Sequence, residues 1–194
     1  PTTGADAGIA SVPAAAEAFP AADASEGAAA EYCDLLFCHG SARAEKLWPE
    51  QSWIELAQQV IAAGYTVALP HGTVDEYSRA KRIAAAVASE KICILPSMDL
   101  THLANSMQAL RGVVAVDTGL AHLAAALQVP GLTLYGPTDV NLIGTSGLQQ
   151  RHVLAEPVGS SMAHMEAITV ATVWESSCAL LAITAAPNPS PPSS

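Results

Sequence analysis

The sequence predicts an α/β fold, a Rossmann-like parallel sheet with helices on both faces. Three observations favour this fold. Short apolar runs alternate along the chain with longer segments whose apolar residues recur at helical spacing. Hydrophobic residues make up 51% of the chain and aromatic residues only 5%, a composition that suits alanine-rich helices packed on a sheet. A length of 194 residues is enough for one domain with its own core.

Composition divides the chain into three segments. Residues 1–30 are rich in Ala, Pro, Gly and Ser, and we expect a low-complexity, disordered arm because they bury too little surface to offset their ordering entropy. Residues 31–184 form the predicted Rossmann-like domain. Residues 185–194 are a Pro- and Ser-rich tail of the same kind as the arm.

The first strand is expected at residues 34–38 (DLLFC), and a polar loop follows over residues 39–47. Pro49 suits a first helical position, and Gly64 closes the helix that begins there. The apolar stripe of this helix consists of Trp53, Leu56, Ala57, Val60 and Ile61. The second strand is expected at residues 65–69.

A capping box predicts the start of the second helix, because Thr73 is followed three positions later by Glu76. In such a box the Glu76 side chain would accept a hydrogen bond from the Thr73 amide. The third strand is expected at residues 92–95, and Asp99 can cap a helix over residues 100–110.

We expect the chemistry of the chain to lie in residues 112–136, GVVAVDTGLAHLAAALQVPGLTLYG. The β-branched run at 112–116 fits a strand buried on both faces, and Asp-Thr-Gly at 117–119 breaks it. Residues 120–127 then form a helix, and residues 132–135 form the next strand. One face of that helix would carry Leu120, Leu123, Ala124 and Leu127.

The remainder of the chain is less regular. An irregular loop rich in Gly, Pro and Asn is expected from residue 136 to about residue 147, followed by a short strand at 152–154. Thr169 caps the last predicted helix. That helix carries Val170, Val173, Trp174, Ser177 and Leu181 on its apolar side.

Polar side chains follow four of the predicted strands, at the edge of a parallel sheet where ligands bind. They are Ser41, Arg43 and Lys46 after the first strand, His71, Gly72 and Glu76 after the second, Ser97 and Met98 after the third, and Asp117, Thr118 and Gly119 after the fourth. A helix that begins at this edge offers unpaired amides and a partial positive charge, which suit a phosphate group. The sequence therefore predicts an anion-binding site there.

Several of these residues also have plainer structural explanations. Asp117 and Thr118 are ordinary N-cap residues, and Lys46 could be a solvated surface lysine. His122, one turn into the predicted helix, either faces the phosphates or is a satisfied core histidine.

Charge and cysteine usage exclude some classes of function. Of the net charge of −10, residues 1–34 carry −6 and the remainder −4, which argues against a nucleic-acid-binding surface. The four cysteines, Cys33, Cys38, Cys93 and Cys178, form no CxxC motif and have no His at zinc spacing, so we expect reduced thiols of a cytosolic protein. No apolar run approaches the roughly 18 residues of a membrane span, and no signal-like amino terminus is visible.

Motifs in a fixed order carry a family resemblance. They are RAEKLWPE at 43–50, DTGLAHL at 117–123, and YGPTD at 135–139 with LIG at 142–144. Over about residues 35–182 the chain resembles the carboxyl-terminal half of the ADP-heptose:lipopolysaccharide heptosyltransferases, most closely the heptosyltransferase I branch. The resemblance implies the second, Rossmann-like domain of a two-domain GT-B glycosyltransferase. It also implies inverting transfer of L-glycero-D-manno-heptose from ADP-heptose, without a metal or other cofactor, to the Kdo residue of lipid A at the cytoplasmic face of the inner membrane.

The same resemblance assigns site residues. It places Ser41, Lys46, Thr118 and Gly119 at the diphosphate, Glu76 at the ribose, Met98 at the adenine pocket, and Asp117 and His122 at the heptose and phosphates. Lys46 would neutralise charge that grows on the departing ADP.

The chain also departs from the family pattern. Ala42 replaces a second hydroxyl residue after the first strand, Val140-Asn141 replaces Pro-Gly, and Ser146 replaces a tyrosine. The family's amino-terminal domain, which binds the acceptor and supplies the general base, has no counterpart in residues 1–30. We therefore expect a fragment that is inactive alone, with acceptor binding and peripheral membrane association belonging to the other domain. The alternatives are a non-catalytic sugar-nucleotide-binding module and a nucleotide-sugar epimerase-like domain of the same architecture.

Overall fold

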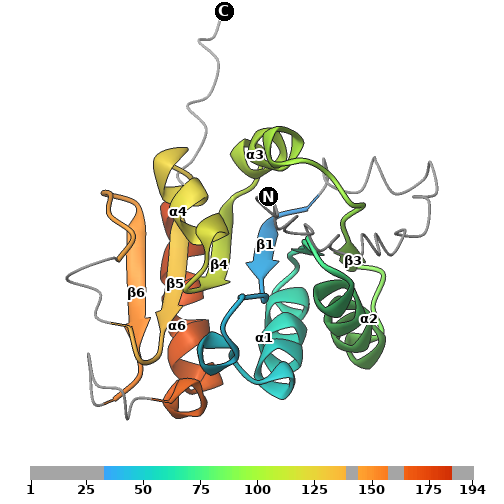
Figure 1. Cartoon of the computed structure of the whole chain (residues 1–194), viewed down its shortest axis with the longest axis horizontal. Coiled ribbons are helices and arrows are strands. Elements are labelled where there is room, and N and C mark those ends of the chain that lie inside the picture. Colours follow the sequence, from blue (N-terminus) through green and yellow to red (C-terminus); the bar gives the residue numbers. More distant parts are fainter. Residues whose placement is uncertain (1–32, 139–143, 157–163, 185–194) are drawn as a thin grey trace, which may run out of the picture.

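The computed structural model describes residues 33–138, 144–156 and 164–184 and confirms the α/β fold class. Six parallel strands form one sheet in the order β3-β2-β1-β4-β5-β6 (Figure 1). They are β1 (Leu35–Cys38), β2 (Val67–Leu69), β3 (Ile92–Ile94), β4 (Gly112–Val116), β5 (Gly131–Tyr135) and β6 (Gln150–Leu154). The chain winds outward from β1 to β3 and then returns to the other side of β1, so the strand order reverses between β1 and β4. This is the place where ligands bind in open α/β sheets.

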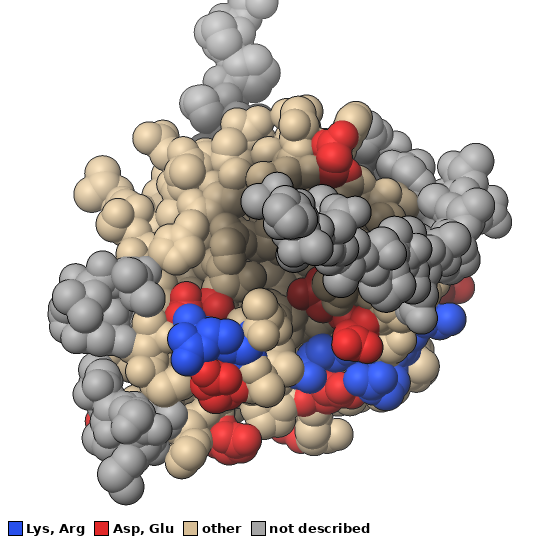
Figure 2. Space-filling view, in the orientation of Figure 1, with Lys and Arg blue, Asp and Glu red and all other residues tan. Residues whose placement is uncertain are grey.

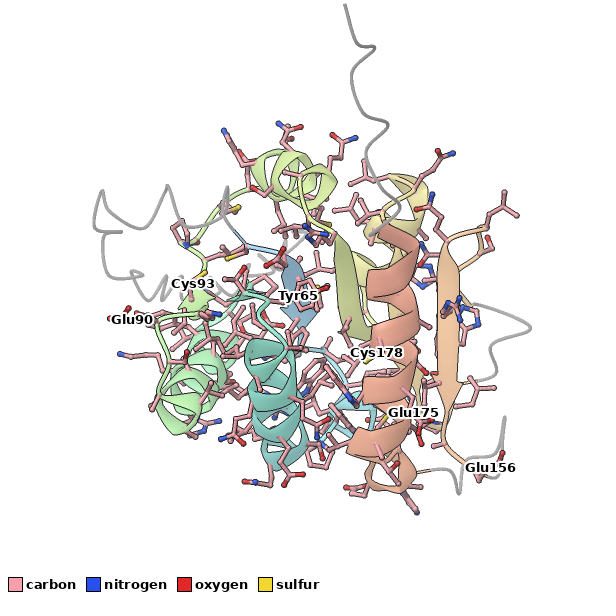
Figure 3. All side chains as sticks on the ribbon, turned by 180° about the vertical axis from the view of Figure 1, so that it is seen from behind. Tyr65, Glu90, Cys93, Glu156, Glu175 and Cys178 are labelled. Atoms are coloured by element: carbon pink, nitrogen blue, oxygen red, sulfur yellow. The ribbon has the colours of Figure 1, made fainter. Side chains whose placement is uncertain are left out.

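Helices cover both faces of the sheet. On one face lie α1 (Glu50–Ala62), α2 (Val74–Val87) and α6 (Val170–Thr184), which Figure 3 shows in front of the strands. On the other face lie α3 (Leu100–Gln108) and α4 (Gly119–Ala126). Two short 3₁₀ helices, η2 (Ala44–Lys46) and η3 (Met165–Ala167), complete the described elements.

The core follows from the alternation of side chains along the strands. In β1, Leu35 and Phe37 pack on the side of α1, α2 and α6, while Leu36 and Cys38 pack on the side of α3 and α4. The buried Trp53 ring packs against Phe37 with a centroid distance of 5.2 Å, and the buried Trp48 ring packs against Trp53 at 5.1 Å. The Trp48 indole donates to the Ile168 carbonyl at 2.9 Å, so the loop before α1 is fastened to the segment before α6.

The predicted helix caps at Asp99 and Thr169 are confirmed. The Asp99 carboxylate accepts from the His102 amide at 2.9 Å, and the Thr169 hydroxyl accepts from the Thr172 amide at 3.2 Å. Pro49 is the residue before α1 rather than its first residue. The predicted 65–69 strand is shorter in the structure, since β2 begins at Val67.

The predicted apolar face of α4 packs against the core, with alanines as its most buried residues. Ala121 and Ala124 are the buried residues of this helix, and the leucines of the predicted face are half-buried. Ala121 and Ala124 belong to the core on the side of α3 and α4, and the three leucines pack against that core. The predicted arm and tail, and the Val140-Asn141 substitution, lie outside the described residues.

Candidate functional site

Three neighbouring strands end in a cluster that we call the polar network, made of Ser41, Lys46, Asp117 and Thr138. Ser41 and Lys46 follow β1, Asp117 follows β4 and Thr138 follows β5. The Lys46 Nζ lies 2.6 Å from Asp117 Oδ2, and the Thr138 hydroxyl donates to the same oxygen at 2.6 Å. The Ser41 hydroxyl donates to the Asp117 carbonyl at 3.5 Å. The place where the strand order reverses, between β1 and β4, thus contains a connected set of polar contacts.

This network decides between the two interpretations of Lys46 and Asp117. The side chains of Lys46 and Asp117 are only 13% and 6% exposed, so Lys46 is not a solvated surface lysine. The Asp117 carboxylate binds Lys46 and Thr138 instead of capping a helix. Thr118 occupies the N-cap position of α4, yet its side chain makes no cap hydrogen bond. The amino-terminal end of α4 is therefore left available to an anionic ligand.

Beside the network, a cavity of about 230 Å³ opens between the ends of β1, β2 and β3 and the helices α3 and α4. Its polar lining includes Glu76 and Thr118, and its apolar lining includes Met98, Leu100 and Leu120. Figure 2 shows this face of the molecule hollowed near its centre, with Lys, Arg, Asp and Glu side chains gathered below the hollow. The cavity combines an apolar wall with one carboxylate, a lining that suits a flat heterocycle carrying a hydroxylated sugar.

Glu76 is held at the wall of this cavity. Its carboxylate Oε2 accepts from the Gly72 amide at 2.7 Å, and its own amide donates to the Thr73 hydroxyl at 3.2 Å. The predicted capping box is thus half correct: Thr73 caps α2, but Glu76 pairs with Gly72 rather than with the Thr73 amide. The other carboxylate oxygen, Oε1, lies over Gly40, where a Cβ atom would come within 2.2 Å of it. The turns after β1 and β2 together set the position of the carboxylate.

The remaining predicted residues lie around these two regions. Gly119 is exposed at the start of α4, and His122, one turn further, is also exposed, so the core-histidine alternative is wrong. Arg43 is exposed and paired with Glu45 at 2.6 Å. Ser97 is exposed and is not among the residues that line the cavity.

Two residues at the site were not predicted from the sequence. Thr138 lies in the YGPTD motif directly after β5, and its place behind a strand end is a signal that could have identified it. His39, the first residue after β1, is fully buried, and this burial, aided by the positive charge of Arg79, lowers its pKa to about 4. His39 is therefore neutral at pH 7 and carries no charge that would bind an anion.

In 33–138, 144–156 and 164–184, no three His, Cys, Asp or Glu side chains gather as a metal site. Over the same part of the chain, no helix is long and apolar enough to cross a membrane.

The model of glycosyltransferase family 9 (heptosyltransferase) matches residues 8–169. The chain belongs to this family. A curated relative, lipopolysaccharide heptosyltransferase 1 of Pseudomonas aeruginosa, is 44% identical over 119 residues, which are 61% of this chain and 33% of the relative. Lipopolysaccharide heptosyltransferase 2 of Salmonella typhimurium is 34% identical over 108 residues, 53% of this chain and 31% of the relative.

A solved structure of E. coli heptosyltransferase WaaC with ADP superimposes with a TM-score of 0.70 at 35% sequence identity, covering 77% of this chain and 45% of that chain. The predicted family resemblance is confirmed, and neither the epimerase-like nor the non-catalytic alternative is favoured. The chain spans about a third of the length of the curated relatives that it matches.

Proposed function

We propose that this chain is the sugar-nucleotide-binding half of a heptosyltransferase of type 1, which uses ADP-heptose in lipopolysaccharide biosynthesis. The observation that carries the proposal is the adjacency of the cavity and the polar network at the reversal of strand order. Type 1 is favoured over type 2 because the type 1 relative is 44% identical and the type 2 relative 34%.

The nucleotide would lie along the strand ends from β3 to β4. Met98 and its apolar neighbours would hold the adenine, and the Glu76 carboxylate would accept from the ribose hydroxyls. A carboxylate has about four acceptor positions, so the contact with the Gly72 amide leaves room for both hydroxyls. ADP bound to the similar WaaC structure supports an adenine nucleotide as the ligand.

The diphosphate would lie between Lys46 and the start of α4. An ammonium group has three N–H donors, and the ion pair with Asp117 engages one of them, so Lys46 can still donate to phosphate oxygens. Thr118, Gly119 and Ser41 would add hydroxyl and amide donors, while Asp117 and His122 would face the heptose and phosphates. As the bond from heptose C1 to the diphosphate breaks, negative charge grows on the leaving phosphate, and Lys46 with the α4 amides would stabilise it.

The complete reaction needs groups beyond this site. We expect the Kdo-lipid A acceptor to bind to the family's amino-terminal domain, which would also supply the general base for inverting transfer. Peripheral association with the cytoplasmic face of the inner membrane would be a property of that domain. We further expect that transfer requires no metal ion.

Calorimetric titration of the purified chain with ADP, ADP-heptose and UDP-sugars tests the proposal. We expect ADP and ADP-heptose to bind more tightly than any UDP-sugar, with affinities unchanged by EDTA. A ligand that binds the native state must also raise the melting temperature. No stabilisation by any adenine nucleotide at millimolar concentration would overturn the proposal.

A further inference from the structure

Two cysteines lie in contact at the start of the sheet. The Cys33 and Cys93 sulfur atoms are 3.3 Å apart, although the residues are 60 positions apart in sequence. Cys93 belongs to β3, and Cys33 lies just before β1, with β2 between these two strands. Both residues are half-buried, so reagents from solution can reach them.

The fold explains how the two thiols meet across a strand. Ala68 of β2 is in register with Cys93 of β3 on one side and with Leu36 of β1 on the other. Cys33 and Cys93 both pack against the part of the core that contains Ala68, on the face covered by α3 and α4. Both thiols therefore lie on the same face of the sheet, where they meet at 3.3 Å.

The residue after Cys33 is anchored to the segments before β2 and β4, which holds the backbone next to Cys33 in place. The Asp34 amide donates to the Thr66 hydroxyl at 2.9 Å. The Asp34 carboxylate accepts from the Thr66 amide at 2.9 Å and from the Arg111 guanidinium at 2.7 Å. These partners precede β2 and β4, which flank β1 in the sheet.

The contact also makes the two thiols unequal. The hydrogen bond between the two thiols holds the pKa of Cys33 below its ordinary value. The pKa of Cys93 is raised by the same contact and by burial. Both shifts favour the thiolate at Cys33, and the 3.3 Å contact places the Cys93 sulfur within reach of any group bound to the Cys33 sulfur.

The other two cysteines differ from this pair. Cys38 is buried, and burial raises its pKa, so it is shielded from reagents. Cys178 is exposed on α6, and Figure 3 shows it well apart from Cys93, which lies at the β3 side of the sheet. Cys38 and Cys178 therefore serve as internal controls, one for a buried thiol and one for an exposed thiol.

We propose that Cys33 and Cys93 are a modification site that small-molecule disulfides such as oxidised glutathione convert to an intramolecular disulfide. The Cys33 thiolate attacks one glutathione sulfur, the glutathione disulfide bond breaks, and the first glutathione leaves and takes up a proton. Cys93 then loses its proton and attacks the Cys33 sulfur of the mixed disulfide, releasing the second glutathione. The protein loses two protons and two electrons, and the reagent gains them as two thiols.

The Cys33–Cys93 disulfide would close a loop that contains β1, α1, β2 and α2, and with them Lys46 and Glu76. A disulfide that closes a loop of this length restricts mainly the unfolded chain, so we expect the melting temperature to rise by roughly 5–15 °C.

The test uses the full chain with Cys178→Ser, which removes the exposed competitor. After incubation with oxidised glutathione, we expect the loss of two titratable thiols, no retained glutathione, and a cross-linked peptide that joins Cys33 to Cys93. Dithiothreitol should restore both thiols and reverse the rise in melting temperature. The matched control, Cys178→Ser with Cys93→Ser, should stop at a stable mixed disulfide on Cys33.

Three results in the Cys178→Ser chain would each overturn the proposal. They are glutathione retained on Cys33, a cross-link that involves Cys38, and unreacted thiols at a reagent excess that modifies Cys178 in the parent chain. None of these measurements depends on nucleotide binding, so the proposed function can fail or succeed independently.

Discussion

The polar network and the cavity share the end of β1 but satisfy their polar groups in different ways. In the network, the nearly buried carboxylate of Asp117 is matched by Lys46 and Thr138, both 2.6 Å away. In the cavity, the Glu76 carboxylate accepts from one backbone amide beside a largely apolar wall. Changes in the network should therefore lower both stability and ligand affinity, while changes in the cavity should lower mainly affinity.

Removing the cation of the network should have the largest effect. We expect Lys46→Met to lower the free energy of unfolding by about 3–5 kcal/mol, because the carboxylate of Asp117 would remain buried without its cation. ADP binding should weaken by about 10–100-fold through the loss of a charge-assisted contact. Urea denaturation and calorimetry measure the two effects.

A double variant separates them. Lys46→Met combined with Asp117→Asn removes the unpaired charge, so most of the lost stability should return while ADP affinity stays low. Affinity equal to that of the parent would show that Lys46 does not bind the diphosphate. Unchanged stability in the single variant would show that the pair contributes nothing to the fold.

The loop that joins the two regions should make the protein sensitive to acid. Burial lowers the pKa of His39 to about 4, whereas the unfolded chain binds this proton near the ordinary value of about 6.5. The unfolded state therefore gains protons first as the pH falls, and stability should decrease between about pH 6.5 and pH 4, by about 3 kcal/mol. The polar network and the cavity should unfold together at acid pH, because His39 lies in the loop that carries Lys46.

Denaturation curves over this pH range test the role of His39. In His39→Gln the stability should depend less steeply on pH, even if it is lower at neutral pH. Parallel curves for the parent and this variant would assign the acid sensitivity to other groups.

Thr138 should have a smaller effect within the network. Thr138→Val keeps the shape of the side chain but removes the hydroxyl that donates to Asp117. We expect a loss of about 1–3 kcal/mol in the free energy of unfolding and a weaker effect on ADP affinity than that of Lys46→Met. Thr138→Ser retains the donor and should recover most of the loss. Equal losses in the Val and Ser variants would indicate packing rather than the hydrogen bond.

How far the sequence predicts the molecule depends on the range of the interactions. The strand Gly112–Val116, the turn after it and the cap at Asp99 follow from local patterns, and the structure confirms them. The Lys46–Asp117 pair joins residues 71 positions apart, and it forms because β4 lies beside β1. No spacing in the chain encodes that adjacency, so the site could be predicted as a set of strand ends but not as a set of contacts.

Glu76 shows the same limit within a single turn. The sequence correctly predicts that Thr73 caps α2, but the carboxylate of Glu76 binds the Gly72 amide instead of the Thr73 amide. The two donor amides belong to adjacent residues, and Gly40, which lies close to the carboxylate, accompanies the observed pairing. Local geometry allowed either arrangement, and the neighbouring strand end selected between them.

Substitution of Glu76 should have the smallest effect on stability. It tests whether changes in the cavity, unlike those in the network, lower mainly ligand affinity. Glu76→Gln keeps an oxygen that can accept from the Gly72 amide but removes the charge that strengthens bonds from ribose hydroxyls. We expect the melting temperature to stay nearly unchanged while ADP binding weakens several-fold. Glu76→Ala should be worse in both respects because it also loses the contact with Gly72. If the Gln variant binds ADP as well as the parent and the Ala variant only loses stability, the carboxylate serves the turn before α2 and not the ribose.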